Sequence, residues 1–554
     1  SNPELAVFYY SYESDVYDMN YYKLPFTEFQ GGKGTIDNPY LIATVGDLQQ
    51  MKGDLDGCYK LVADIDMSKM PTAWTPMNGF NGKLDGNGHS ISNLVINTKL
   101  TEVGLFGNMA EGGSVRNLTF VNPTIKVNKG NAYVGIIAGM AMTDTLQNVH
   151  VYGANIIDAS GEADITVGGL VGQSTVYGEI SSCSFNGTIN TPAASAVGGI
   201  AGDTRTATFV FSSKASGNFT GESNVGGIVG TTGTDGQVFD CHVNADLTAL
   251  NTIGGIVGSN GSRAGVNRNY AVGTIKALKS SWRGFAAGGI LGHIESDWTQ
   301  KDSVIISGNV SQMDIILPKG TTSMKGVNRI VGYTIADEEY MPGEKRLKEI
   351  GMANNYATAS IKVNGKTISS DDDKSVNGAS KEAADYNKDF FTAIGYVYGT
   401  TAAEPWKGEK GMPVLYFENE AAAITMDSEK IITAPGLDRK LVITVYGTDA
   451  SEINVTSSND EVAAVEIVEE TDNSITISIT SKQEGTAVIT ATAGNCTATC
   501  EVISSAAAGI EGIENSTSNG IEEVFNTNGV RLNSLQKGMN IVRMRDGRVK
   551  KVVM

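Results

Sequence analysis

Several features that define other classes of protein are scarce in this chain of 554 residues. Its four histidines never lie one helical turn apart, which excludes the paired histidines of a zinc-protease helix. No stretch approaches the roughly 18 apolar residues that a membrane-spanning helix needs. Basic residues are outnumbered, 42 against 61 acidic ones, and the net charge of −19 disfavours nucleic acid and anionic membranes as partners.

The motifs of acyl-transfer and nucleotide chemistry are incomplete as well. The stretch Gly221–Val225 lacks the last glycine of a nucleophile elbow. Gly365–Thr367 lacks the first glycine of a phosphate-binding loop, because position 360 is Ser360. The acidic loop 371–373 shows no ligand pattern beyond its charge. We therefore expect no catalytic, cofactor-binding or metal-binding residues.

What the chain does contain is a recurring six-residue phrase, VGGLVG at 167–172. Close copies stand at 134–139, 197–202, 225–230, 253–258 and 287–292, with weaker forms at 103–107 and 329–332. The last glycines of these copies, here called the repeat glycines, are at positions 107, 139, 172, 202, 230, 258, 292 and 332. Successive intervals are 32, 33, 30, 28, 28, 34 and 40 residues. A repeat of roughly 20–50 residues predicts a solenoid, a propeller or an array.

Each interval also holds a second run of β-branched residues, as in ISSCSFNGTI at 180–189, and no helix-length amphipathic segment. Short strands separated by Gly, Asn and Ser turns predict one coil of a parallel β-helix. Stacked coils place like residues about 4.8 Å apart and so build ladders of Val, Ile and Leu. Crossovers between parallel strands favour one hand, so we predict an all-β chain organised around a right-handed parallel β-helix. Alternation alone leaves open which face of the phrase points inward.

These copies resemble the GLUG motif, which is found in surface and secreted bacterial proteins and is associated with adhesion. Some proteins that carry it are proteases of immunoglobulin A, but the histidine spacing of their zinc-protease part is absent here. Residues 421–503 alternate strictly and resemble a bacterial Ig-like group 2 domain, which implies a β-sandwich. Residues 521–554 resemble the C-terminal sorting-type tails of Gram-negative surface proteins and imply a short β tail.

The expected organisation is an N-terminal extension (1–30), the β-helix with its end caps (31–420), the Ig-like domain (421–503), a linker (504–520) and the tail (521–554). The chain opens on Ser1-Asn2-Pro3 without the features of an export signal, and we expect any such signal either to be missing from this sequence or to have been removed already.

Both ends of the β-helix carry candidate caps. Thr44-Val-Gly-Asp47 has the spacing of a capping box and predicts a short helix over the open end of the solenoid. A second helix is expected around 381–389. The aromatic segment 390–416 resembles the closing part of GLUG arrays and is expected to cap the far end.

The positions of two cysteines predict how the coils stack. Cys183 and Cys241 each follow a repeat glycine by 11 positions, which places them in one row with Ser213 between them. Two coil spacings, nearly 10 Å, exceed the roughly 4.4–6.8 Å between the Cα atoms of a disulfide. Cys496 and Cys500 lie about 13 Å apart if their strand is extended. Buried, unpaired thiols are predicted for the first pair at least.

Other side chains are weaker candidates. Asp144 and Asp235 share a row three coils apart, with no acid between them, and are interpreted as turn residues. Trp282 and Trp298 stand with the polar stretch 337–350 where the intervals lengthen, and insertions in solenoids form loops on one face, often a binding face. Exposed tryptophans suit stacking on sugars, although anchoring in a core or loop is the interpretation we favour.

Together these features predict a non-catalytic protein of a Gram-negative bacterium, either secreted or at the cell surface in association with the outer membrane. An adhesin or ligand-binding solenoid is the first hypothesis, with an extracellular protein or glycan as its partner and no membrane span. A carbohydrate-active or carbohydrate-binding β-helix is the second. A structural surface or fimbria-associated component is the third. The adhesion hypothesis comes from the family resemblance, because a fold alone does not define a function.

Overall fold

The computed structural model describes residues 29–142, 144–279, 284–294, 305–333 and 351–505 in full. Near the two ends of the chain it also describes strands β1 (Leu5–Tyr10), β2 (Tyr17–Tyr22), β51 (Ile521–Asn526), β52 (Arg531–Leu532), β53 (Met539–Met544) and β54 (Val549–Val553). Strands hold 53% of the residues and helices 5%, which confirms the all-β class. The chain divides into two compact units, Ser1–Tyr416 and Phe417–Met554.

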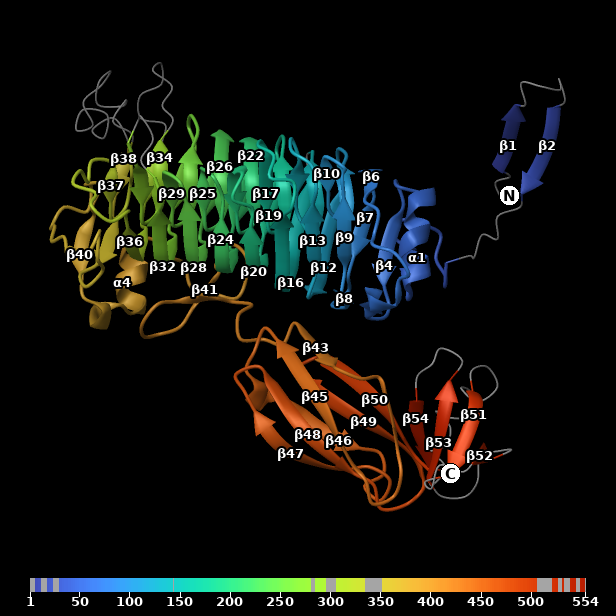
Figure 1. Ribbon diagram of the computed structural model, residues 1–554. Helices are drawn as coiled ribbons and strands as arrows, with labels where there is room; N and C mark the ends of the chain where they lie inside the picture. Colours follow the sequence, from blue (N-terminus) through green and yellow to red (C-terminus); the bar gives the residue numbers. More distant parts are fainter. Residues whose placement is uncertain are drawn as a thin grey trace. The chain divides into compact units, whose positions relative to one another are not determined.

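The first unit contains a parallel β-solenoid of about eight turns, as predicted, whose coils stack side by side (Figure 1). In one complete coil the chain passes from β17 to β18 and then to β19 and β20, which lie in three different places on the coil wall. The first sheet consists of β10 (Glu102–Val103), β14 (Tyr133–Val134), β17 (Ile165–Gly168), β21 (Ala194–Gly198), β25 (Val225–Gly226), β29 (Thr252–Gly254), β33 (Ala286–Gly288) and β37 (Val327–Asn328).

The second sheet follows directly in each coil, after the middle of the VGGLVG phrase. It consists of β6 (Met77–Phe80), β11 (Phe106–Met109), β15 (Ala138–Ala141), β18 (Val171–Ser174), β22 (Ala201–Thr206), β26 (Val229–Thr234), β30 (Val257–Asn260) and β34 (Leu291–Ile294). The phrase therefore spans the bend between two sheets and is not a single strand.

The third sheet is the largest and takes two runs from most coils. Its strands are β3 (Tyr40–Ile42), β4 (Cys58–Leu61), β5 (Ile65–Asp66), β7 (Lys83–Asp85), β8 (Ser90–Ser92), β9 (Val95–Thr98), β12 (Ser114–Val121), β13 (Thr124–Val127), β16 (Thr145–Asp158), β19 (Glu179–Ser181), β20 (Ser184–Asn190), β23 (Phe209–Phe211), β24 (Lys214–Thr220), β27 (Gln237–Phe239), β28 (His242–Ala249), β31 (Gly265–Asn267), β32 (Tyr270–Ala277), β35 (Ile305–Ser307), β36 (Val310–Ile316), β38 (Gly351–Ala353), β39 (Tyr356–Thr358) and β40 (Ala379–Lys381). The expected first coils, 59–66 and 80–96, are confirmed by the parallel pairs β4–β7 and β5–β8.

The register confirms the column of repeat glycines. The residues that follow these glycines pair in parallel from coil to coil, in the order Met140, Gln173, Asp203, Thr231, Ser259 and His293. The motif valines form their own ladder in the first sheet, namely Val134, Val167, Val197, Val225 and Ile253. In this second ladder like residues lie over like residues, and the Val and Ile side chains are fully buried in one continuous apolar core.

Glycine is required in the phrase because the sheets approach each other closely. A Cβ atom on Gly168 would lie 2.7 Å from the backbone nitrogen of Gly202 in the next coil, so the first two sheets meet backbone to backbone. The next glycine faces the third sheet instead. A Cβ on Gly227 would lie 2.5 and 2.6 Å from the two methyl groups of Val243. The alternation of residues in the phrase did not show which of its faces points into the solenoid. The close approach of the neighbouring sheets decides this.

The N-terminal end is closed as the capping box predicts. Helix α1 (Val45–Gln50) continues into the 3₁₀ turn η1 (Met51–Gly53) and lies at the right-hand end of the solenoid in Figure 1. The Thr44 hydroxyl accepts a hydrogen bond from the Asp47 amide at 3.1 Å, and the Asp47 carboxylate accepts one from the Thr44 amide at 2.9 Å. Leu48 and Met51 are fully buried against the first coils. A second 3₁₀ turn, η2 (Met67–Lys69), follows β5.

The far end is closed by residues 361–381 and not by the aromatic segment 390–416, so that expectation is wrong. The amides of Ile330 and Val331 in the last coil both donate to the Val376 carbonyl. The fully buried guanidinium of Arg329 donates to the carbonyls of Ile368, Asn377 and Gly378 at 2.8, 3.0 and 2.8 Å. These bonds hold the closing loop over the core of the last coil.

The later segment lies along the side of the solenoid. After η3 (Ala383–Asp385) and α4 (Lys388–Ala393), residues 396–416, here called the flanking segment, run beneath the third sheet in Figure 1. This segment contains the antiparallel pair β41 (Trp406–Lys407) and β42 (Val414–Leu415). The helix expected around 381–389 is present but begins later, because Asn387 is its N-cap and accepts the Phe390 amide at 3.0 Å.

The second unit contains two four-stranded sheets around their own apolar core. One holds β43 (Ala423–Met426), β45 (Asp438–Tyr446), β48 (Ser474–Thr480) and β47 (Ala464–Glu470); the other holds β44 (Lys430–Thr433), β50 (Cys496–Ser504), β49 (Gly485–Ala493) and β46 (Asn454–Ser457). A 3₁₀ turn, η4 (Ala450–Glu452), connects β45 and β46. Alternate residues of β48 are buried, as strict alternation predicts. Strands β51 to β54 form a separate antiparallel sheet in the tail.

Candidate functional site

The third sheet turns a corner in each coil between its two runs, and this corner collects the polar side chains. One residue per coil has a positive φ there, between 48° and 71°: Asn117, Asn148, Ser182, Ser212, Asp240, Arg268, Gly308 and Asn354. The next residue of each coil is fully buried: Leu118, Val149, Cys183, Ser213, Cys241, Asn269, Asn309 and Asn355. The buried column therefore changes from apolar to polar along the solenoid.

The polar part of this column is an asparagine ladder. Asn269 donates through Nδ2 to Oδ1 of Asn309 at 3.1 Å, and Asn309 donates likewise to Asn355 at 3.0 Å. The same amide groups also donate to the backbone carbonyls of the preceding coils at 2.8–3.0 Å. Because the ladder bonds the corner of one coil to the next, its role is to fix the stacking.

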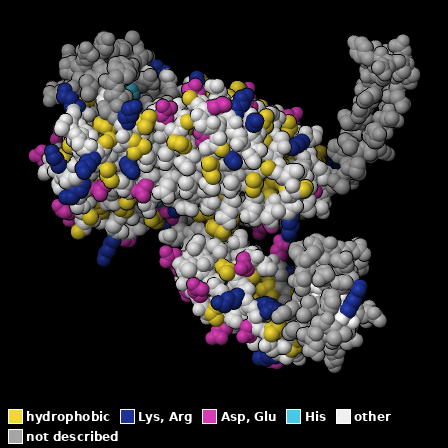
Figure 2. All heavy atoms as spheres, in the orientation of Figure 1, with side chains coloured by type: hydrophobic (Ala, Val, Ile, Leu, Met, Phe, Trp, Pro, Cys, Tyr) yellow, Lys and Arg dark blue, Asp and Glu magenta, His cyan; other side chains and the backbone are white. Residues whose placement is uncertain are grey.

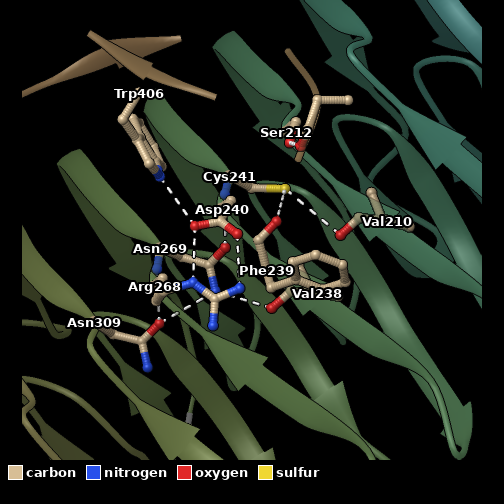
Figure 3. Close-up of polar contacts among 11 residues, drawn as sticks. Val210, Ser212, Val238, Phe239, Asp240, Cys241, Arg268, Asn269, Asn309 and Trp406 are labelled. Carbon is tan, nitrogen blue, oxygen red and sulfur yellow. Dashed lines mark hydrogen bonds and ion pairs between the residues drawn. The ribbon is translucent and has the colours of Figure 1, made fainter. Parts of the chain in front are cut away.

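Asp240 stands beside this ladder and has the appearance of an active-site acid (Figure 3). Arg268 donates two hydrogen bonds to its carboxylate, from Nε to Oδ1 at 2.9 Å and from Nη2 to Oδ2 at 2.7 Å. Trp406 of the flanking segment donates to Oδ1 at 2.9 Å. Burial works to lower the pKa of Arg268, but the bonds and charge of Asp240 raise it. With both oxygens bonded beneath a fully buried indole, Asp240 ties the flanking segment to the solenoid and is not a free acid or base.

Three further bonds extend this attachment along the corner. The hydroxyl of Tyr416 donates to Ser182 at 2.9 Å, and Ser212 donates to the Ala402 carbonyl at 2.6 Å. Tyr270 donates to the Pro413 carbonyl at 2.8 Å. Its ring stacks on His242 at 4.7 Å, beneath Trp406. The sequence does not reveal this site, since its partners are more than 140 positions apart.

The histidines do not form a site either. His150 is buried in the same outward row as His242, with Ser184 on Nδ1 and Asn148 on Nε2, each at 2.9 Å. Burial, with the charge of Lys214, lowers its pKa to about 4, so the ring is neutral at physiological pH. Because its ring is neutral and both ring nitrogens are hydrogen-bonded, we assign His150 a structural role.

The cysteines lie as the row argument predicts. The Cys183 amide donates to the Ser213 hydroxyl at 3.1 Å, which confirms that Ser213 lies between the two cysteines. None of the five cysteines, all of them in the described part of the chain, forms a disulfide, and Cys183, Cys241 and Cys500 are buried. Burial raises the pKa of Cys183 to about 12 and that of Cys241 further. Thiols held protonated in this way are poor nucleophiles and poor metal ligands.

The two aspartates of the shared row differ. Asp235 is a turn residue with φ of 61° and is paired with Arg263 at 2.5 Å, as expected. Asp144 lies in the short connection between β15 and β16, but its side chain is buried, only 1% exposed, and accepts a hydrogen bond from Ser174 at 3.0 Å. Burial raises the pKa of Asp144 to about 6. Its Oδ2 atom has no hydrogen-bond partner among the described groups.

A pocket on the described surface was not found by sequence reasoning. It has a volume of about 560 Å³, and its described lining comes from residues 278–279, 284–285 and 318–325 of the last coils. Its walls include Leu278, Phe285 and Pro318, with the lysines Lys279, Lys319 and Lys325 around them. A signal for it was present in the two longest repeat intervals. We therefore treat this lysine pocket as the candidate binding site.

Some of the residues singled out in the sequence are not described by the structure. Trp282 and Trp298, and the stretch 337–350, lie outside the described residues. Within the part of the chain that is described, no three His, Cys, Asp or Glu side chains group to hold a metal ion. No helix among those residues is long and apolar enough to cross a membrane.

The fold and surface thus define a β-solenoid of glycine-rich coils joined to a two-sheet unit. The family model for the GLUG motif matches residues 163–190, which span β17 to β20, one complete coil. Halomucin of Haloquadratum walsbyi is 34% identical over 183 residues, which are 31% of this chain and 2% of halomucin. A protein described as a Gly-rich membrane protein of Evansella cellulosilytica is 38% identical over 122 residues, 20% of this chain and 14% of that protein. The chain thus spans only a small part of these relatives.

Solved structures of the S-layer protein SbsC are also similar in part. Its domains 4 and 5 are 27% identical, with 18% of this chain and 61% of that chain covered and a TM-score of 0.15. Domains 5–6 are 23% identical, with 15% and 43% covered and a TM-score of 0.14. TM-scores this low give the likeness no weight for fold or function.

Proposed function

We propose that this chain is a non-catalytic protein of the cell surface or a secreted one, whose solenoid binds an extracellular protein or glycan in the manner of an adhesin. The observation that carries the proposal is the match of the repeated coil to the GLUG motif and to segments of much longer proteins, one named a mucin and one a membrane protein. A coil that recurs in such proteins is a building block for extended surfaces.

The parts of the chain take distinct roles in this proposal. The stacked coils form a rigid wall, because their backbone is bonded along three sheets and their corner by the asparagine ladder. Residues 421–503 serve as an Ig-like spacer, and residues 521–554 as a sorting tail. We place the protein at the outer membrane of a Gram-negative bacterium on the same family resemblance.

A carbohydrate-binding solenoid is the second candidate. The lysine pocket favours it, because its volume of about 560 Å³ lies in the range of small-molecule and sugar sites, roughly 300–1,000 Å³. A purely structural surface component is the third candidate, and the continuous core and closed ends support it.

The test is a binding array of glycans and extracellular matrix proteins, probed with the labelled full chain. The same chain after heat denaturation is the control for adhesion of unfolded protein. We expect at least one ligand to bind the folded chain alone. Absence of any such ligand contradicts the proposal, and so does turnover of a polysaccharide by the purified chain. Protease treatment of intact cells tests the location, since a surface protein is removed without lysis.

A further inference from the structure

Strand β47 of the second unit is the last strand at one side of its sheet. It pairs with β48, and no other described residue bonds to its backbone. A terminal strand leaves the amides and carbonyls of its outer edge unpaired, which makes that edge a template for a further strand. The outer edge of β47 can therefore accept the backbone of another chain by β-augmentation.

The side chains of β47 are more exposed than those of a strand that lies wholly over a core. The five residues from Glu466 to Glu470 are all exposed, so both faces of the strand meet solvent there. Ile467 is 53% exposed although Ile477, its partner on β48, is fully buried, and Val468 in the adjoining bulge is 48% exposed. In Figure 2, apolar side chains lie among the Asp and Glu side chains of the described part of this unit. An added strand would cover apolar surface of this kind.

The charge of β47 restricts which strand can be added. The strand carries Glu466, Glu469 and Glu470 and no basic residue. Like charges that face each other across a strand pair are destabilising, so these glutamates disfavour the pairing of β47 with a second β47. They favour a strand that carries lysine or arginine.

The chain itself contains such a strand. β54 reads VKKVV, with Lys550 and Lys551 and no acidic residue, and it is likewise a terminal strand of its described sheet, where it pairs with β53. Residues 521–554 hold seven basic residues against three acidic ones, in a chain whose net charge is −19. The hairpin of β1 and β2, which reads LAVFYY and YDMNYY, contains no basic residue. Charge complementarity thus selects β54.

We infer that β54 of one copy of this chain adds to the outer edge of β47 of a second copy, with its lysine positions next to the glutamate positions of β47. The contact joins two different surfaces, so it links copies head to tail into open chains, or into a closed pair if each copy donates to the other. Main-chain hydrogen bonds supply the affinity and the charges select the partner. This role is additional to the sorting role proposed above and does not depend on ligand binding.

The experiment measures self-association of the full chain by sedimentation velocity over a range of protein concentrations. The variant E466K/E470K reverses two charges of β47, and K550E/K551E reverses both charges of β54. A variant with all four changes has opposite charges on the two strands again. The matched control is E420K/E452K, which makes the same change in net charge as E466K/E470K at exposed glutamates outside β47. Circular dichroism and thermal unfolding verify that every variant folds.

We expect the parent chain to form dimers or longer chains as its concentration rises, and each double reversal to weaken this association about tenfold or more. The variant with all four changes should regain the association, and the control should keep it. A parent chain that stays monomeric at every concentration overturns the inference. Equal weakening by the control overturns it too, and so does a failure of the four changes together to restore association.

Discussion

Replacing Gly227 by valine would place a branched side chain where the third sheet leaves no room. The new Cβ would lie 2.5 and 2.6 Å from the methyl groups of Val243 and would overlap the carbonyl oxygen of Gly255 in the next coil. Ordinary contacts of a Cβ atom begin near 3.4 Å. Neither neighbour can give way easily, because Val243 is fully buried and the Gly255 oxygen belongs to the backbone of the stack.

The expected cost follows from this geometry. Overpacking of a formed core typically costs about 1–3 kcal/mol, and a clash with fixed backbone places this case near about 3 kcal/mol. Such a change raises the local opening of the coil roughly a hundredfold, since about 1.4 kcal/mol corresponds to a factor of ten. A solenoid transmits the damage to neighbouring coils and little further.

Native-state hydrogen exchange and limited proteolysis measure this effect. We expect faster exchange and new cleavage within residues 200–260, while residues 421–503 stay protected. The control is Gly236→Ala, in the turn after β26, where the nearest atoms lie 3.4 and 3.5 Å from the new Cβ. That variant should change stability by no more than about 0.5 kcal/mol.

Two results would refute the reasoning. Equal loss of protection in the solenoid and in residues 421–503 would mean that the chain unfolds as one cooperative unit. An unchanged exchange pattern in Gly227→Val would mean that the glycine column is not needed for the close approach of the sheets.

Three further predictions concern the buried polar groups. Arg329→Ala leaves the carbonyls of Ile368, Asn377 and Gly378 without their donor and should cost about 3 kcal/mol or more, measured as proteolysis within 361–381; intact protection there contradicts the role of Arg329. Because burial raises the pKa of Asp144 to about 6, its contribution to stability is full below its unfolded pKa near 4 and is lost as the pH rises through 6. Asp144→Asn should therefore reduce the loss of unfolding free energy between pH 4 and 7 by about 3 kcal/mol, and equal pH profiles of variant and parent would oppose this. Trp406→Ala should release the flanking segment at a cost of about 3–5 kcal/mol, seen as faster exchange at 396–416 with residues 120–180 unchanged; no change in the flanking segment would show that other contacts hold it.

The sequence by itself determined the coil. Spacing of the repeat glycines predicts the solenoid, the column they form and the row shared by Cys183, Ser213 and Cys241, because a stacked repeat converts sequence period directly into spatial register. The capping box at Thr44–Asp47 was equally visible, since its partners are three residues apart. In the second unit, strict alternation predicts the buried faces of the strands.

Only the tertiary structure decided what lies across the coils. The sequence of segment 390–416 predicts an end cap. In the structure the loop held by Arg329 closes that end, and Trp406 of the segment donates a hydrogen bond to Asp240. Asp144 reads like a turn residue but is buried, because the bend before β16 points it inward against Ser174. The lysine pocket is lined by residues from two adjacent coils, and the lengthened intervals predict insertions in these coils without their mutual geometry. Contacts between residues far apart in the chain depend on packing free energies that no local pattern encodes, and these contacts made the flanking attachment and the candidate site.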